Sequence, residues 1–140
     1  MNNNLIITIS RQYGTGGREI GQKLALHLGI PFYDRELITR AAKKTGFDEK
    51  LFEQLDKRAT NSFLYSLTMF GSVGLNGMSL TDQLYLAQSN IVREMAEDSA
   101  CVIVGRCADH VLRDFPNKFD FFIHGSIEDR VKRIQTCGDY

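Results

Sequence analysis

Short, continuous apolar runs alternate along the chain with longer segments in which apolar residues recur every three or four positions. The first run is Leu5–Ser10, and later runs end at Asp34, Gly105 and His124. Each run is rich in β-branched or aromatic residues and is bounded by polar ones, which is typical of a buried strand. Because the runs are continuously apolar, the pattern predicts a mostly parallel sheet that helices cover on both faces.

Helical periodicity fills the segments between these strands. The first predicted helix begins near Gly17 and ends before Gly29, with an apolar face of Ile20, Leu24, Ala25 and Leu28. Three further helices are predicted after residues that can serve as N-caps, namely Asp34, Asp48 and Ser126. Two more are predicted over Leu80–Glu97 and Ala108–Arg113. In the last helix, Ser126 and Asp129 form a capping box, and Ile127, Val131 and Ile134 are expected to face inward.

Residues 46–80 fit this alternation poorly. Within 60–79, apolar residues are followed by three glycines and several small polar residues. One interpretation is a helix on the core followed by a plain loop, and the other is a mobile substrate-side segment that acts as a flap. The apolar stretch 63–75 would serve equally well as an interface, so a homodimer stays open.

Composition and charge narrow the class of protein. The length of 140 residues favours one domain, and 17 basic residues balance 17 acidic ones, so no nucleic acid polymer or anionic membrane surface is expected as a partner. No apolar run is long enough to span a bilayer, and the N-terminus has no signal-peptide pattern. The three cysteines form no CxxC pair and the three histidines are scattered, which indicates cytoplasmic free thiols and no metal site.

The stretch TISRQYGTGGREIG, residues 8–21, carries the candidate chemistry. It predicts a strand, a glycine-rich turn and a helix, so that Gly14, Gly16 and Gly17 allow backbone N–H groups and the helix N-terminus to face an anion. Parallel sheets bind ligands at the C-terminal ends of their strands, where this turn lies. A phosphate of a nucleotide suits the turn.

Two known glycine motifs match this turn incompletely. A dinucleotide-binding GxGxxG would need glycine at position 19, which is Glu19. In a Walker A loop with Gly16 as the last glycine, Gly17 would occupy the lysine position and Arg18 the hydroxyl position. From the pattern alone, a glycine turn without any ligand remains an alternative.

A wider resemblance bears on this choice. ITISRQYGTGGREIGQKLALHLGIPFYDRELI resembles the opening of cytidylate kinase-like proteins, a branch of the P-loop nucleoside monophosphate kinases that carries Gly-x-Gly-Gly-Arg-Glu, here Gly14–Glu19. CVIVGRCADHVLRDFPNKFDFFIHGSIEDRVKRI is similar to the later kinase segment with its Gly-Arg motif. The resemblance covers both ends of the chain and is weak over residues 47–80. It implies that the missing lysine is a family trait.

The resemblance also implies a fold and an activity. The expected fold is a single three-layer α/β/α domain over residues 1–140, of the P-loop kinase type. The family's lid and last strand would follow Tyr140, so the chain is expected to be truncated before them, although a tail that simply ends there is the other interpretation. The implied activity is transfer of a phosphoryl group from ATP, with Mg²⁺, to a small acceptor such as CMP or dCMP. The alternatives are a nucleotide-binding regulatory module with little or no kinase activity, and a structural α/β domain with an empty turn.

Donor phosphates are expected at the glycine turn. The residues that would surround them are Arg11, Tyr13, Gly14, Thr15, Gly16, Gly17, Arg18 and Glu19. Arg18, or Arg11 from the other side of the turn, would replace the lysine as the cation. Phosphoryl transfer needs mainly such positioning and charge neutralisation from the protein.

The acceptor is expected at the ends of two other strands. The resemblance implies that Asp34, Arg35 and Arg106 hold it, since a guanidinium meets two phosphate oxygens and keeps its charge. Asp109 resembles a carboxylate that orders magnesium through water. Each of these residues also has a structural alternative. Arg106 could form an ion pair with Asp109 or Asp114, and Asp109 could instead oppose the dipole of its helix. Asp34 could cap the next helix, and Arg35 and Arg40 could lie on a solvated helix face.

The last predicted helix carries two further arginines. Arg130 and Arg133 resemble the approach to the family's lid, whose arginines reach over the transferring phosphate. Cys107 lies beside the Gly-Arg motif, but no histidine or aspartate accompanies it as a catalytic partner, so it is expected to serve packing.

Overall fold

A computed structural model of the chain describes residues 3–35, 37–38 and 80–137. In chain order the elements are β1 (Ile6–Arg11), α1 (Gly17–Leu28), β2 (Phe32–Tyr33), α5 (Leu80–Asp98), β3 (Cys101–Val104), α6 (Ala108–Val111), β4 (Lys118–Ile123) and α7 (Ile127–Cys137). The four predicted strands are confirmed, as are the helices predicted after Gly17, over Leu80–Glu97, after Ala108 and after Ser126, with small shifts at the ends. The helix predicted after Asp34 lies mostly outside the described residues, and the one predicted after Asp48 lies wholly outside them. The flap and dimer hypotheses for residues 46–79, and the position of Arg40, lie outside the described residues.

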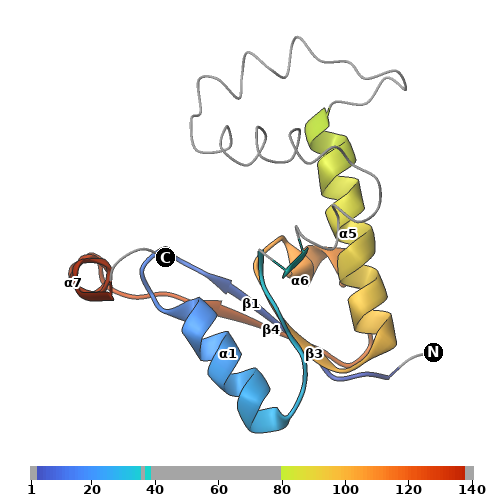
Figure 1. The fold of residues 1–140 in the computed structure, drawn as a ribbon, viewed down its shortest axis with the longest axis horizontal. Coiled ribbons are helices and arrows are strands. Elements are labelled where there is room, and N and C mark those ends of the chain that lie inside the picture. Colours follow the sequence, from blue (N-terminus) through green and yellow to red (C-terminus); the bar gives the residue numbers. More distant parts are fainter. Residues whose placement is uncertain (1–2, 36, 39–79, 138–140) are drawn as a thin grey trace.

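The four described strands form one sheet with the order β2–β3–β1–β4, and every pairing is parallel (Figure 1). In β1, one of the two central strands, Ile6 lies opposite Cys101 of β3 on one side and Lys118 of β4 on the other. Because the strands are parallel, their C-terminal ends meet at one edge of the sheet. The glycine turn after β1 and the Gly105 turn after β3 therefore lie side by side.

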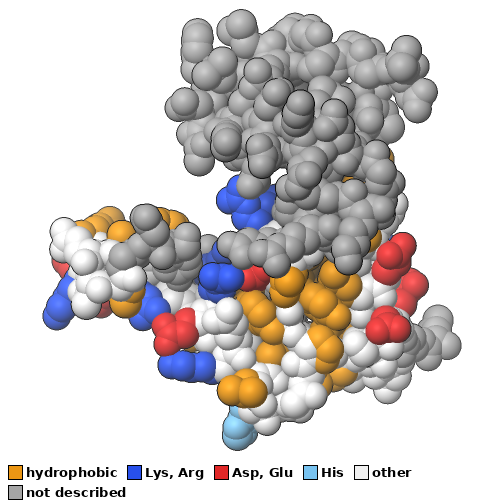
Figure 2. Space-filling view, in the orientation of Figure 1, with side chains coloured by type: hydrophobic (Ala, Val, Ile, Leu, Met, Phe, Trp, Pro, Cys, Tyr) orange, Lys and Arg blue, Asp and Glu red, His pale blue; other side chains and the backbone are white. Residues whose placement is uncertain are grey.

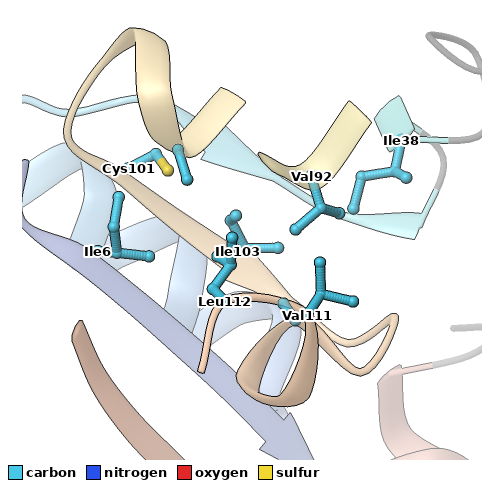
Figure 3. Packing of buried hydrophobic residues seen from close by; sticks show 9 residues of the cluster. Ile6, Ile38, Val92, Cys101, Ile103, Val111 and Leu112 are labelled. Carbon is cyan, nitrogen blue, oxygen red and sulfur yellow. The ribbon is translucent and has the colours of Figure 1, made fainter. Parts of the chain in front are cut away.

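Two apolar layers hold helices against the sheet, as the three-layer prediction requires. On one face Ile6 and Ile103 pack with α5 and α6 residues that include Val92 and Val111 (Figure 3). On the other face Ile7, Ile9, Val102 and Val104 pack with Ala25 of α1. Successive strand residues point to opposite faces, so a continuously apolar strand supplies both layers. The α/β/α prediction is confirmed.

Helix α1 lies closer to the sheet than its apolar pattern predicts. A Cβ added at Gly21 would lie 2.7 Å from the Val104 Cγ2 atom, so only glycine permits this approach. The helix consequently presents the narrow face of Gly17, Gly21 and Ala25 to the sheet. Ile20 and Leu28, expected inside, are each 42% exposed. Gly29 ends the helix in the left-handed conformation, as predicted.

The edge strand β4 departs from the expectation of a sheet covered on both faces. Its aromatic side chains Phe119, Phe121 and Phe122 are 53%, 51% and 62% exposed. On α7, the predicted inner residues Ile127 and Val131 are also exposed. Only one edge of β4 is paired in the described chain, and α7 turns instead toward the glycine turn. Apolarity alone did not identify the face that becomes buried.

No helix in the described part of the chain is both long enough and apolar enough to cross a membrane.

Candidate functional site

The turn after β1 has the geometry that its glycines predict. Gly14 and Gly16 have positive φ angles of 83° and 77°, a conformation that costs residues with a side chain about 1–2 kcal/mol. The Thr15 hydroxyl donates a hydrogen bond to the Gln12 carbonyl oxygen at 2.8 Å, which closes the turn on itself. Helix α1 then begins at Gly17. Its N-terminus faces the C-terminal edge of the sheet.

Helix α7 packs directly against this turn (Figure 1). A Cβ at Gly14 would lie 2.8 Å from the Ile134 Cδ1 atom, and a Cβ at Gly16 would lie 2.8 Å from the Arg133 Cζ atom. The Arg130 Nε atom donates a hydrogen bond to the Tyr13 carbonyl oxygen at 2.7 Å. The glycines therefore make room for α7 as well as shaping the turn. Both arginines expected near a lid lie beside the turn.

Glu19 anchors Arg133 in this position. The Arg133 Nη2 atom donates to the Glu19 carboxylate at 2.5 Å, and Lys23 donates to the other carboxylate oxygen at 2.6 Å. The hydrogen bond from Lys23, followed by that from Arg133, lowers the pKa of Glu19 below its usual range. Figure 2 shows basic side chains gathered with acidic ones on this side of the molecule, between α7 and α5. Glu19 thus offsets one of the cations beside the turn.

Arg18 and Asp34 form an ion pair that joins the turn to the end of β2. The Nε and Nη2 atoms of Arg18 each lie 2.7 Å from Oδ2 of Asp34, whose residue is 5% exposed. The other oxygen, Oδ1, accepts a hydrogen bond from the Leu37 N–H at 3.1 Å and caps the helical turn that includes Arg35. Asp34 therefore caps this turn, as one interpretation of the sequence predicts, and its other oxygen pairs with Arg18. The Arg18 guanidinium therefore lies beside the end of β2.

Arg11 takes a different path from the end of β1. A Cβ at Gly17 would lie 2.8 Å from both Cβ and Cγ of Arg11, and a Cβ at Gly105 would lie 2.5 Å from its Nη1 atom. The side chain therefore runs across Gly17 and reaches the end of β3. Its guanidinium lies where the ends of the two central strands meet.

The Gly105–Arg106–Cys107 turn is strained. All three residues have positive φ angles, 80°, 58° and 52°, and the latter two lack glycine's freedom. Such residues cost of order 1–3 kcal/mol each and are commonly found at functional sites. The Arg106 Nη1 atom donates a hydrogen bond at 3.3 Å to Oε1 of Gln88, a residue of α5 that is 7% exposed. The strained turn directs Arg106 toward α5.

Gln88 is the site residue that sequence analysis missed. It is a polar residue four positions after Leu84 and three before Ile91, within the apolar stripe of its helix. A polar side chain on the apolar face of a helix is buried only when it has a hydrogen-bond partner, so Gln88 in the sequence already indicated a polar contact there. Its contact makes Gln88 a residue that positions Arg106.

The carboxylates proposed as ion-pair partners of Arg106 lie elsewhere. Asp114 pairs with Arg93 at 3.6 Å and with Arg113 at 3.9 Å. Asp109 lies in the first turn of α6, and the contact that the structure gives for it is a hydrogen bond from Lys118 to its backbone oxygen at 3.0 Å. Neither Asp109 nor Asp114 therefore forms the ion pair with Arg106 that the sequence suggested.

The described residues offer magnesium no ready-made protein site. Within them no group of three His, Cys, Asp or Glu side chains is placed to hold a metal. The hydroxyl position of a Walker loop is Arg18, which is bound to Asp34, and the nearby Thr15 hydroxyl is bound to Gln12. The residues present at the turn therefore do not fit a protein-held Mg²⁺.

This arrangement of glycine turn, strand ends and arginines agrees with the sequence comparison. The profile of the cytidylate kinase-like family matches residues 6–138. The chain belongs to the cytidylate kinase-like family. No curated protein sequence matches the chain.

A solved structure supports the fold. An uncharacterized protein from Eubacterium ventriosum is 29% identical, and superposes with a TM-score of 0.64 over 96% of this chain. The match covers 63% of that protein, so the chain spans less than two thirds of its length.

Proposed function

We propose that this chain carries the nucleotide site of a nucleoside monophosphate kinase, with ATP at the glycine turn and an acceptor such as CMP or dCMP beyond β2 and β3. The observation that supports this most directly is the ion pair of Arg18 with Asp34, 2.7 Å long. It ties the first turn of α1 to the end of β2, so the proposed donor and acceptor subsites adjoin each other. A turn that merely connected a strand to a helix would not require that link.

The proposed reaction breaks the bond between the γ-phosphorus of ATP and its bridging oxygen. A new bond forms from that phosphorus to an acceptor phosphate oxygen, and ADP leaves with the bridging oxygen. The protein contributes positioning and positive charge. Backbone N–H groups of the turn would hold the donor, and Arg106, held by Gln88, would hold the acceptor phosphate. Magnesium would enter with the nucleotide, and none of these roles depends on a protein ligand for it.

Transfer of labelled phosphate tests the proposal. The chain is incubated with radiolabelled ATP, Mg²⁺ and, separately, CMP, dCMP, UMP or AMP, and labelled diphosphates are separated by chromatography. The proposal expects a labelled cytidine diphosphate that Arg106→Ala reduces by at least about tenfold, as loss of a charged hydrogen bond would. The matched control is Arg113→Ala, which removes an equal charge at an exposed position just after α6.

The regulatory alternative has its own outcome. It is favoured by Arg18 at the hydroxyl position, because this side chain cannot replace a hydroxyl as a magnesium ligand. ATP binding without transfer to any acceptor would support a nucleotide-binding module and contradict the kinase proposal. Absence of ATP binding would contradict both.

A further inference from the structure

Arg11 occupies the space that a Walker lysine would need. With Gly16 as the last glycine of the turn, the lysine position is Gly17. The φ angle of Gly17 is not in the left-handed region, so its backbone would accept a side chain. The obstacle is Arg11, because a Cβ at Gly17 would lie 2.8 Å from two of its carbon atoms. A glycine at position 17 therefore leaves the space that the Arg11 side chain occupies.

The guanidinium of Arg11 reaches the place where phosphate charge would be neutralised. At the far end of the Arg11 side chain, Nη1 lies 2.5 Å from where a Cβ of Gly105 would be, so a side chain at 105 would collide with it. The φ angle of 80° at Gly105 also favours glycine. Gly105 donates its own backbone N–H to Ile9 in the sheet at 3.0 Å. Arg11 thus lies along the C-terminal edge of β1 and β3, between the donor turn and Arg106. Two glycines leave room for this one side chain.

The charge of Arg11 is not offset by a carboxylate of the described chain. Across residues 3–35, 37–38 and 80–137 no Asp or Glu forms an ion pair with it. Two arginines around the turn differ, because Arg18 pairs with Asp34 and Arg133 pairs with Glu19. Arg130, on α7, donates to the Tyr13 carbonyl oxygen instead. A partly buried cation without a counter-charge is costly unless an anion binds beside it. Arg11 is therefore the loop arginine best prepared for an incoming phosphate.

We propose that Arg11 replaces the Walker lysine as the cation for the donor phosphates, reaching them from the strand instead of from the helix. This inference rests on the proposed function and names a residue within it. It also resolves the choice between Arg11 and Arg18: Arg18 positions Asp34 at the acceptor side, and Arg11 contacts the donor. A guanidinium suits this place because its fork can bridge two phosphate oxygens.

A reciprocal pair of substitutions tests the inference in the 140-residue chain. Binding of ATP with Mg²⁺ and, separately, of CMP is measured by calorimetry, and urea unfolding is followed for each variant. We expect Arg11→Ala to weaken ATP binding about 10- to 100-fold, as the loss of a charged hydrogen bond predicts, and to leave CMP binding within about threefold. Gly17→Lys alone should lower the urea midpoint, because its side chain meets Arg11.

The double variant is decisive. Once Arg11→Ala has vacated the space, Gly17→Lys should recover the urea midpoint and restore ATP binding to within about tenfold of the original chain, as one charged contact regained requires. Arg113→Ala is the control for general loss of charge. Unchanged ATP binding in Arg11→Ala, or a double variant no better than Arg11→Ala, would overturn the inference while leaving the proposed function standing. An original chain that binds no ATP would overturn the proposed function and this role with it.

Discussion

Breaking the ion pair between Arg18 and Asp34 should cost more than an ordinary surface pair. The Asp34 side chain is 7% exposed and the Arg18 side chain 39% exposed, and two guanidinium nitrogens lie 2.7 Å from the same oxygen. A hydrogen bond to a charged group contributes about 1.5–3 kcal/mol. Solvent around Arg18 screens part of this. We therefore expect a coupling free energy of about 1–2 kcal/mol between the two side chains.

A double-mutant cycle isolates that energy. Asp34→Asn removes the charge but keeps an oxygen for the Leu37 N–H, whereas Asp34→Ala removes both contacts and should cost about 1 kcal/mol more for the lost cap. Arg18→Met keeps much of the stem without the guanidinium. In urea unfolding, the double variant Arg18→Met with Asp34→Asn should have a free energy of unfolding only slightly below that of the less stable single variant. The denaturant slope should remain the same in all variants.

The chain supplies its own control for this cycle. Lys23 and Glu19 form an i,i+4 pair on the exposed surface of α1, with side chains 75% and 48% exposed. Their coupling should be smaller than that of the Arg18 pair, and 1 M salt should weaken it further. Additive effects of Arg18→Met and Asp34→Asn, within about 0.3 kcal/mol, would refute the claim that this link holds the turn to β2.

Three further predictions concern stability and reactivity. Cys107 is exposed, so the packing role expected for it from the sequence is wrong. Burial raises the pKa of the Cys101 thiol to about 11. At pH 8 a thiol reagent should therefore label the exposed Cys107 and Cys137 rapidly and Cys101 only after unfolding, and rapid labelling of all three would contradict this. For Asp120, desolvation is outweighed by hydrogen bonds from Lys118 and Thr8, and the net effect lowers its pKa. The Asp120 carboxylate therefore stabilises the fold above its unfolded-state pKa of about 4, and this stabilisation is lost as the pH falls through the lower folded-state pKa. Asp120→Asn should reduce the acid-side dependence of the free energy of unfolding on pH. An unchanged acid-side dependence would contradict this. Gly16→Ala should lower the free energy of unfolding by about 1 kcal/mol more than Gly29→Ala. Both glycines have positive φ, but only a side chain at Gly16 would collide with Arg133. Equal melting temperatures of the two variants would show that Arg133 moves aside without cost.

Much of this architecture is encoded locally and is legible in the sequence. Gly29 terminates α1, Asp34 caps the following turn, and Ser126 and Asp129 form their capping box with a 2.7 Å hydrogen bond. These features depend on residues a few positions apart. Strand and helix types therefore followed from the pattern.

The contacts between distant segments were not legible in the same way. Nothing in the sequence between Arg11 and Gly105 indicates that the two lie together, because the parallel pairing of β1 with β3 creates that contact. Ile20 was expected inside because it is apolar, but Gly21 sets the face that approaches the sheet. The choice between Arg11 and Arg18 as the cation required knowledge of their contacts, which only the fold supplies.

Amide spectra of the isotope-labelled chain during titration with ATP and Mg²⁺ test the central claim most directly. The claim is that donor phosphates bind the turn between β1 and α1. The predicted result is saturable chemical-shift change concentrated at Gly14, Gly16 and Gly17, extending to Gly105 across the Arg11 side chain. Shifts that are absent at saturating ATP, or that gather on α5 and spare the glycine turn, would contradict the account.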